Sequence, residues 1–138
     1  MHTLGHGFIP PPIYSGGLSY HGMAPTLCLL NEEKDVTTVA YNQIDIFEAA
    51  KLFAKTEGIV PAPEPAHGIK GTIDEALKCK ETGEEKTILF ILCGHGHFNM
   101  QAYDDYLQGK LLLYEHPHES VKKAIDKLKR MYPWSSTF

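Results

Sequence analysis

The stretch that decides the fold is residues 88–100, "ILFILCGHGHFNM". From Thr87 to Leu92 the chain is apolar without alternation. A strand that is apolar on both faces is typical of a central, parallel strand covered by helices. The run stops at Cys93, and the residues that follow it are Gly94, His95, Gly96 and His97. This abrupt end indicates a metal site, a reactive thiol or a loop that holds a ligand.

Upstream of this run the sequence predicts one strand and two helices. Residues 36–41, "VTTVAY", favour a short strand. Residues 43–56 have apolar side chains at helical spacing, and Gly58 follows where a left-handed residue can close the helix. A second helix is expected from Pro65 to just before Gly83. The side chains expected to face inward are Ile46, Ala49, Ala50, Phe53 and Ala54 in the first helix and Ala66, Ile69, Ile73, Ala76 and Leu77 in the second.

Downstream of the run the pattern is again helical. Asn99 is expected to cap a short helix over residues 100–108 that ends at Gly109. A C-terminal helix is expected from about Glu119, with Val121, Ala124, Ile125, Leu128 and Met131 facing inward. The order strand, helix, helix, strand, helix predicts an α/β fold for residues 36–138.

Residues 1–26 are rich in glycine and proline and are expected to be irregular. A domain rarely begins with so long a segment without secondary structure. The segment is therefore expected to be either a functional loop or the middle of a larger protein.

Composition narrows the possible partners. The chain has 138 residues and a net charge of −4, and no basic patch stands out, so nucleic acid is not an expected partner. No apolar run approaches the roughly 18 residues that cross a membrane. The three cysteines are widely spaced, which favours a reducing cytoplasm over a disulfide framework.

Eight histidines raise the possibility of a metal site. His95 and His97 form one H-x-H pair, and His116 and His118 form another. Zinc sites usually add cysteine pairs or an H-E-x-x-H helix, and neither pattern occurs in this sequence. A histidine-based metal-binding protein therefore stays an alternative hypothesis.

Cys93 has three interpretations. With a nearby histidine it could act as a nucleophile, although no local residue supplies an orienting group. It could also be a small buried hydrophobe. Ligands of open α/β sheets bind beyond the carboxyl ends of strands, and Gly94 and Gly96 would let a ligand approach the backbone there. A neutral thiol at that place suits an uncharged heterocyclic nitrogen.

Glu64 stands between two prolines just before a predicted helix, with His67 three residues later. The carboxylate could simply stabilise the helix N-terminus. It could also share a pocket with His67.

Three long motifs together resemble a known family. They are "MHTLGHGFIPPPIYSGGLSYHGMAPTLCLL" at residues 1–30, "TEGIVPAPEPAHGIKGTIDEAL" at residues 56–77 and "ILFILCGHGHFNMQAY" at residues 88–103. In this order and spacing they are similar to the C-terminal part of the tryptophan synthase β chain, closest to its second, longer type. The resemblance covers nearly all of residues 1–138.

The resemblance implies a pyridoxal phosphate enzyme of fold type II, with a three-layer α/β/α domain around a mainly parallel sheet. Such β chains join L-serine to indole. Cys93 would face the pyridine nitrogen, where the family usually has serine, and a neutral group there favours β-replacement chemistry. Glu64 matches the acidic residue of the family's E-x-x-H-A segment, and its expected role is catalytic. Cofactor contacts are expected from Cys93, Gly94, His95 and Gly96.

The resemblance also implies a substrate pocket and a cation site. His67 and Ser19 are expected to line the substrate pocket. Ser19 departs from the family, which has an aspartate or, in the longer type, an arginine at this place. The carbonyl oxygens of Tyr20 and Gly22 match positions that bind Na⁺ or K⁺ in the family.

Two family features have no match in the sequence: the Schiff-base lysine and the glycine-rich phosphate loop, both upstream in the family. The chain alone is therefore expected to be inactive, and Met1 is expected to correspond to an internal methionine. The expected partners are an N-terminal portion of the β chain or further copies of this chain, together with the tryptophan synthase α subunit. A non-catalytic module that associates with itself or a partner is the other hypothesis.

Overall fold

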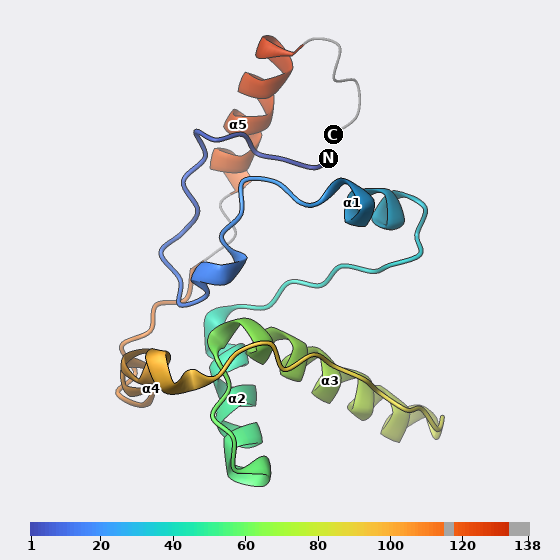
Figure 1. Cartoon of the computed structure of the whole chain (residues 1–138), viewed down its shortest axis with the longest axis vertical. Helices are drawn as coiled ribbons and strands as arrows, with labels where there is room; N and C mark the ends of the chain where they lie inside the picture. The colour runs from blue at the N-terminus through green and yellow to red at the C-terminus, as the bar shows by residue number, and fades with distance from the viewer. Residues whose placement is uncertain (115–117, 133–138) are drawn as a thin grey trace. The chain divides into compact units, whose positions relative to one another are not determined.

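The computed structural model describes residues 1–114 and 118–132 (Figure 1). Within these residues the chain is helical, and its only β pairing is two isolated bridges, Thr3 with Gly22 and Pro61 with His95. Five α-helices are present: α1 (Pro25–Glu32), α2 (Gln43–Glu57), α3 (Pro63–Thr82), α4 (Met100–Leu107) and α5 (His118–Met131). Two short 3₁₀ helices, η1 (Gly16–Leu18) and η2 (Gly96–Asn99), complete the secondary structure.

The chain divides into two compact units. The first unit comprises residues 1–12, 17–38 and the C-terminal part from residue 114. The second comprises residues 13–16 and 39–113 and holds α2, α3 and α4.

Helix α2 forms the centre of the second unit, as its periodicity predicts. The Asn42 side chain accepts a hydrogen bond from the Asp45 backbone N–H, and Gly58 closes the helix in the left-handed conformation at φ 70°. Ile46 and Phe47 are fully buried. The ring of Phe47 contacts Tyr14 and Tyr103 edge-on and stacks on Tyr106.

Helix α3 begins two residues earlier than expected. Pro63 takes the first helical position, where its missing N–H costs nothing, and Gly83 ends the helix at φ 74°. Ala66 and Ile69 are buried against α2, whereas Leu77 is exposed. The prediction that Ala76 and Leu77 face inward is therefore wrong, because the second half of α3 extends beyond α2 (Figure 1).

Helix α4 is present where the sequence predicts it, but its cap is different. The Asn99 side chain makes no capping hydrogen bond, because the 3₁₀ turn η2 leads directly into the helix. Gly109, at φ 67°, follows the helix as expected.

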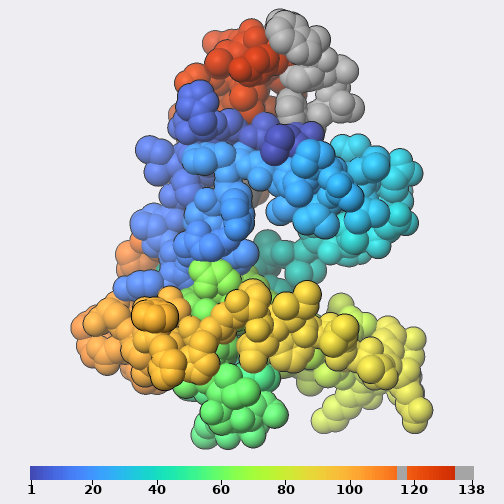
Figure 2. Space-filling view, in the orientation of Figure 1, coloured from blue at the N-terminus to red at the C-terminus, as the bar shows by residue number. Residues whose placement is uncertain are grey.

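The two predicted strands are extended but unpaired. Residues 36–41 and 87–92 belong to no ladder, so the predicted α/β sheet is absent from the described part of the chain. A strand needs a neighbour to satisfy its backbone groups, and the described residues supply none for these two segments. The segment from Lys86 to Gly94, named the return segment here, runs back along α3 and lies at the surface (yellow in Figure 2).

The first unit contains a helix that the sequence analysis missed. Helix α1 starts at Pro25, so residues 1–26 are not irregular throughout. The signal was Pro25 itself, a residue favoured at the first helical position. The buried Cys28 thiol of α1 accepts a hydrogen bond from the His2 backbone N–H at 3.0 Å, which ties the N-terminal segment to the helix.

Helix α5 packs its apolar stripe against the N-terminal segment of the same unit. The side chain of Leu128 lies close to Gly5, whose φ of 77° favours glycine. Val121, Ala124 and Ile125 are half-buried, but Met131 is 48% exposed, contrary to expectation. A cavity of about 580 Å³ remains between residues 3–9 and α5.

Candidate functional site

The candidate site forms where the loop after the apolar run meets the N-terminus of α3. The Gly96 backbone N–H donates to the Val60 carbonyl oxygen at 2.7 Å, and the Ala62 N–H donates to the Gly94 carbonyl oxygen at 3.0 Å. These two hydrogen bonds hold residues 93–97 beside the first turn of α3. Cys93 and Glu64, 29 positions apart in sequence, are thereby brought to the same region of the second unit.

Gly94 and Gly96 permit this close approach. A Cβ on Gly94 would lie 2.9 Å from the Cβ of Ala62. A Cβ on Gly96 would lie 2.7 Å from the Val60 side chain and 2.8 Å from the Pro61 carbonyl oxygen. These three distances are too short for real side chains, so packing alone requires glycine at the two positions. Their expected role in admitting a ligand stays a prediction.

Cys93 is an exposed, free thiol. The interpretation as a buried hydrophobe is therefore wrong, since the extended run that leads to the thiol lies at the surface. An exposed thiol is a neutral, weak hydrogen-bonding group. It can meet a ligand, but no described histidine is hydrogen-bonded to it as a catalytic base would be.

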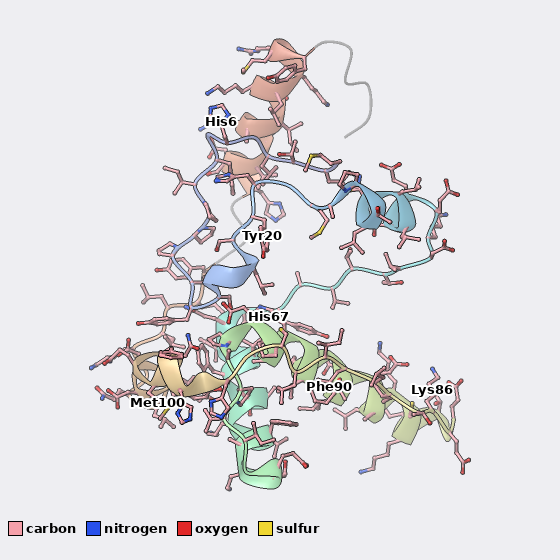
Figure 3. All side chains as sticks on the ribbon, in the orientation of Figure 1. His6, Tyr20, His67, Lys86, Phe90 and Met100 are labelled. Carbon is pink, nitrogen blue, oxygen red and sulfur yellow. The ribbon has the colours of Figure 1, made fainter. Side chains whose placement is uncertain are left out.

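Glu64 and His67 lie on the first turn of α3. Glu64 is half-buried, at a helix N-terminus that favours negative charge. The Nδ1 atom of His67 lies 2.9 Å from the Pro63 carbonyl oxygen. Because a carbonyl oxygen only accepts, Nδ1 carries the proton, and Nε2 is the atom that His67 can offer to a ligand. Figure 3 labels His67 on this turn.

The His95 and His97 side chains interact with each other. Their rings stack with centroids 4.1 Å apart, and the His97 N–H donates to His95 Nδ1 at 3.2 Å. That hydrogen bond occupies the lone pair of Nδ1. No group of three or more histidine, cysteine, aspartate or glutamate side chains that could hold a metal ion exists among the described residues. His116 of the second H-x-H pair lies outside them.

Tyr103 is a site-supporting residue that the sequence analysis missed. Its hydroxyl donates to the Pro61 carbonyl oxygen at 2.6 Å, from a largely buried position on α4. Burial raises the pKa of Tyr103 to about 12. The hydrogen bond fixes residues 60–62, on which the loop at residues 93–97 is built. An aromatic residue with a polar end in an apolar helical stripe was the available signal.

Ion pairs involve Lys86, at the start of the return segment, and Lys70, on α3. Hydrogen bonds to Glu84 and then to Glu75 raise the pKa of Lys86 (labelled in Figure 3). On α3, the Lys70 ammonium pairs with Asp74, and this hydrogen bond lowers the pKa of the Asp74 carboxyl. These interactions order the surface of the second unit, and none of them was anticipated.

The predicted cation site lies in the first unit. Ser19 and Tyr20 are exposed, and Gly22 forms the isolated bridge with Thr3. The carbonyl oxygen of His21, between Tyr20 and Gly22, accepts from the Leu4 N–H at 3.2 Å and from the Thr3 hydroxyl. These contacts shape the turn, while the roles of Ser19, Tyr20 and Gly22 remain predictions.

Comparison with known proteins identifies the relatives of this chain. No family model matches it. It is 64% identical over 111 residues to tryptophan synthase beta chain 2 of Aquifex aeolicus, covering 80% of this chain and 26% of that protein. It is 61% identical over 115 residues to tryptophan synthase beta chain of Thermococcus gammatolerans, covering 83% and 26%. For tryptophan synthase beta chain 2 of Thermococcus kodakarensis the identity is 59% over 118 residues, covering 86% and 27%.

These identities place the chain in the class of tryptophan synthase β-like sequences and confirm the resemblance based on its motifs. The chain corresponds to a segment of a tryptophan synthase β chain-like protein and spans about a quarter of the length of the relatives it matches. Separately, none of the helices in the described ranges is both long and apolar enough to cross a bilayer.

Proposed function

We propose that this chain supplies the cofactor-facing C-terminal part of a pyridoxal phosphate-dependent lyase that makes L-tryptophan from L-serine and indole, in the cytoplasm. The observation that best supports this proposal is the junction of residues 93–97 with the start of α3, which brings Cys93 into the region of Glu64. The identity of up to 64% with tryptophan synthase β chains supports the reaction. The reaction also requires the family's lysine and phosphate loop, which no residue of these 138 matches.

The residues at this junction fit one side of the cofactor. Pyridoxal phosphate supplies the electron-withdrawing ring on which amino-acid substrates react. The exposed Cys93 thiol is uncharged, as a partner for an unprotonated ring nitrogen should be, and the backbone of Gly94, His95 and Gly96 continues from it. The hydrogen bond from the Tyr103 hydroxyl to the Pro61 carbonyl oxygen keeps this backbone in place.

Glu64 and His67 would act from the opposite side of the junction. The carboxylate of Glu64 sets the electrostatic potential near the reacting atoms and can hold a proton. Nε2 of His67 can accept a hydrogen bond from substrate, because Nδ1 is fixed by Pro63. In the first unit, Ser19 would contact the substrate, and the carbonyl oxygens of Tyr20 and Gly22 would coordinate Na⁺ or K⁺.

We further propose that the return segment becomes a strand in the complete protein. Leu89 is 91% exposed, although it lies in an uncharged extended segment. A neighbouring strand from the N-terminal portion would satisfy the backbone and bury this surface, giving the three-layer α/β/α arrangement of fold type II. The α subunit would then bind the completed β chain.

Reconstitution tests this function. The chain is mixed with the part of the Aquifex aeolicus β chain that it does not match, and tryptophan formation from L-serine and indole is measured with added pyridoxal phosphate. We expect product only from the mixture. Tryptophan from this chain alone, or a mixture that assembles and binds cofactor without making product, would contradict the proposal.

Variants of Cys93 test the role of its thiol in the reconstituted mixture. Cys93→Ser keeps a neutral group and is expected to retain activity within about tenfold, or ~1.4 kcal/mol of barrier. Cys93→Asp introduces a carboxylate opposite the ring nitrogen, and we expect a larger loss with a shifted cofactor absorbance. Cys79→Asp, on the outer part of α3, is the matched control and should change neither. If Cys93→Asp and Cys79→Asp changed activity and cofactor absorbance equally, Cys93 would not be part of the cofactor site.

The second candidate function is a non-catalytic module that associates through its exposed apolar surface. The observation that favours it is the same return segment, where Ile91 is 78% exposed. Association without cofactor binding in the reconstitution experiment would support this alternative.

A further inference from the structure

We propose that Gln43 is a positioning residue for the substrate, because its buried amide holds the turn from which the loop carrying Ser19 begins. The inference rests on the proposed function, in which Ser19 contacts the substrate. It adds a residue that lies outside the three motifs behind the resemblance and is not part of the junction at residues 93–97.

The burial of Gln43 is not explained by the helix that it starts. The residue is only 6% exposed, yet the cap of α2 is made by Asn42, whose side chain accepts from the Asp45 N–H. A buried amide costs stability unless it is hydrogen-bonded, so its partners indicate its role. Among the described residues the other buried side chain of this polar kind is Ser15, which is 1% exposed.

The two ends of the Gln43 amide bind two different segments. Nε2 donates to the carbonyl oxygen of Leu112, after α4, at 2.6 Å. Because a carbonyl oxygen only accepts, this hydrogen bond fixes which end of the amide carries the NH₂ group. Oε1 accepts from the Tyr14 backbone N–H at 3.4 Å. The contact with Leu112 therefore orients the acceptor that Tyr14 uses.

Other contacts hold the same turn. The Tyr14 hydroxyl donates to Asp105 of α4 at 2.6 Å, and this hydrogen bond lowers the pKa of the Asp105 carboxyl. The Tyr14 ring lies edge-on to Phe47, with centroids 6.5 Å apart. The Ser15 hydroxyl donates to the Tyr14 carbonyl oxygen at 2.7 Å. Together with the Gln43 amide, these contacts keep residues 13–16 in the second unit.

The loop with the predicted substrate residue starts where this turn ends. Helix η1 follows Ser15 directly, and the Tyr20 N–H then donates to the Leu18 carbonyl oxygen at 3.0 Å. Ser19 is exposed, but it is only four residues from the buried Ser15. An exposed group positions a ligand only when its backbone is held by well-packed neighbours. The turn that Gln43 holds therefore sets where the Ser19 hydroxyl lies.

Substrate kinetics of the reconstituted mixture test this role. Gln43→Met keeps an unbranched side chain of similar length and removes both hydrogen bonds. We expect it to raise the KM for L-serine or for indole by about tenfold, because misplacing a binding group weakens substrate binding. The kcat and the cofactor absorbance should stay within about twofold of wild type. A purely structural role would instead lower kcat and cofactor binding together and leave both KM values unchanged.

Variants on α4 test the same turn without altering the core. Asp105→Ala removes the acceptor of the Tyr14 hydroxyl and should raise the same KM by about threefold. Asp104→Ala is the matched control, since this neighbouring carboxylate accepts from Gln108 at 2.6 Å, and it should leave KM unchanged. Equal KM values for both α4 variants would overturn the proposal. This comparison also decides the question if Gln43→Met does not fold.

Hydrogen exchange of the chain alone tests the turn without the reaction. We expect Gln43→Met to speed amide exchange in residues 13–20 while α2 stays protected, and Asp104→Ala to change neither. Unchanged exchange in residues 13–20 would overturn the proposal.

The two experiments also separate this inference from the proposed function. An inactive wild-type mixture would overturn the proposed function, and the substrate role of Gln43 with it. An active mixture in which Gln43→Met leaves both KM values unchanged would overturn the positioning role alone.

Discussion

Helix α2 and the return segment are both apolar, but among the described residues only α2 has partners for both its backbone and its side chains. Ile46 and Phe47 of α2 are 0% exposed, whereas Leu89 of the return segment is 91% exposed. The helix satisfies its own backbone groups, so it needs only a covering surface, which α3 and α4 provide. The extended segment needs another strand as well as a cover. The same hydrophobicity therefore produces a core in one region and an open edge in the other.

The largest expected effect on stability comes from a substitution in the core around α2. Phe47→Ala removes the ring that contacts Tyr14, Tyr103 and Tyr106 and should lower the free energy of unfolding by about 3–5 kcal/mol. Leu89→Ala should lower it by less than about 0.5 kcal/mol, because the side chain is already in solvent. Urea unfolding followed by circular dichroism at low protein concentration measures both. Similar losses for the two variants would mean that the return segment is buried in solution.

A smaller effect is expected at the hydrogen bond from Tyr103 of α4 to Pro61, on which the loop after the return segment is built. Tyr103→Phe leaves the Pro61 carbonyl oxygen without its donor and should cost about 1–3 kcal/mol of stability. Burial raises the pKa of Tyr103 from its ordinary value of 10.0 to about 12, so the folded state holds this proton more tightly. Stability should therefore decline between pH 10 and pH 12 in the wild-type chain.

Tyr103→Phe should remove part of that decline. The measurement is the unfolding free energy across this pH range for both proteins. An identical pH dependence would show that the Tyr103 hydroxyl is not buried in solution.

The smallest expected effects on stability come from two glycines, one inside α3 and one at its C-terminal end. Gly68 lies inside the helix, and a Cβ there would meet no atom within 4 Å. Gly68→Ala should raise stability by about 1 kcal/mol through helix propensity. Gly83→Ala also meets no atom, but its φ of 74° should make it lower stability by about 1 kcal/mol. Thermal unfolding distinguishes the two, and equal signs would contradict the helix boundaries.

The helices could be predicted from sequence because their signals are local. The spacing of Ile46, Ala49 and Ala50 and the positions of Gly58 and Gly83 depend on neighbours within one or two turns. The cap expected at Asn99 was wrong because a 3₁₀ turn, set by the packing of Gly96 on Val60, precedes α4. Helix α1 was missed because its segment lacks a strong apolar stripe.

The candidate site could be predicted only in part. That Cys93 and Glu64 occupy one region followed from the motifs, and the hydrogen bonds between residues 60–62 and 94–96 agree with it. The packing role of Gly94 and Gly96 and the anchor at Tyr103 could not be predicted, since they depend on contacts between residues far apart in sequence. The sheet was predicted from the apolar run 87–92, but the described chain holds no strand to pair with it.

The central claim is that residues 87–92 form an extended segment whose partner strand is not among the residues that the structure describes. Amide hydrogen exchange measured across a dilution series tests this claim most directly. We expect α2 to be protected at every concentration, and residues 87–92 to exchange rapidly in dilute solution. Protection of residues 87–92 that does not change on dilution would contradict the claim, because it would require a strand partner within the chain, such as residues 36–41.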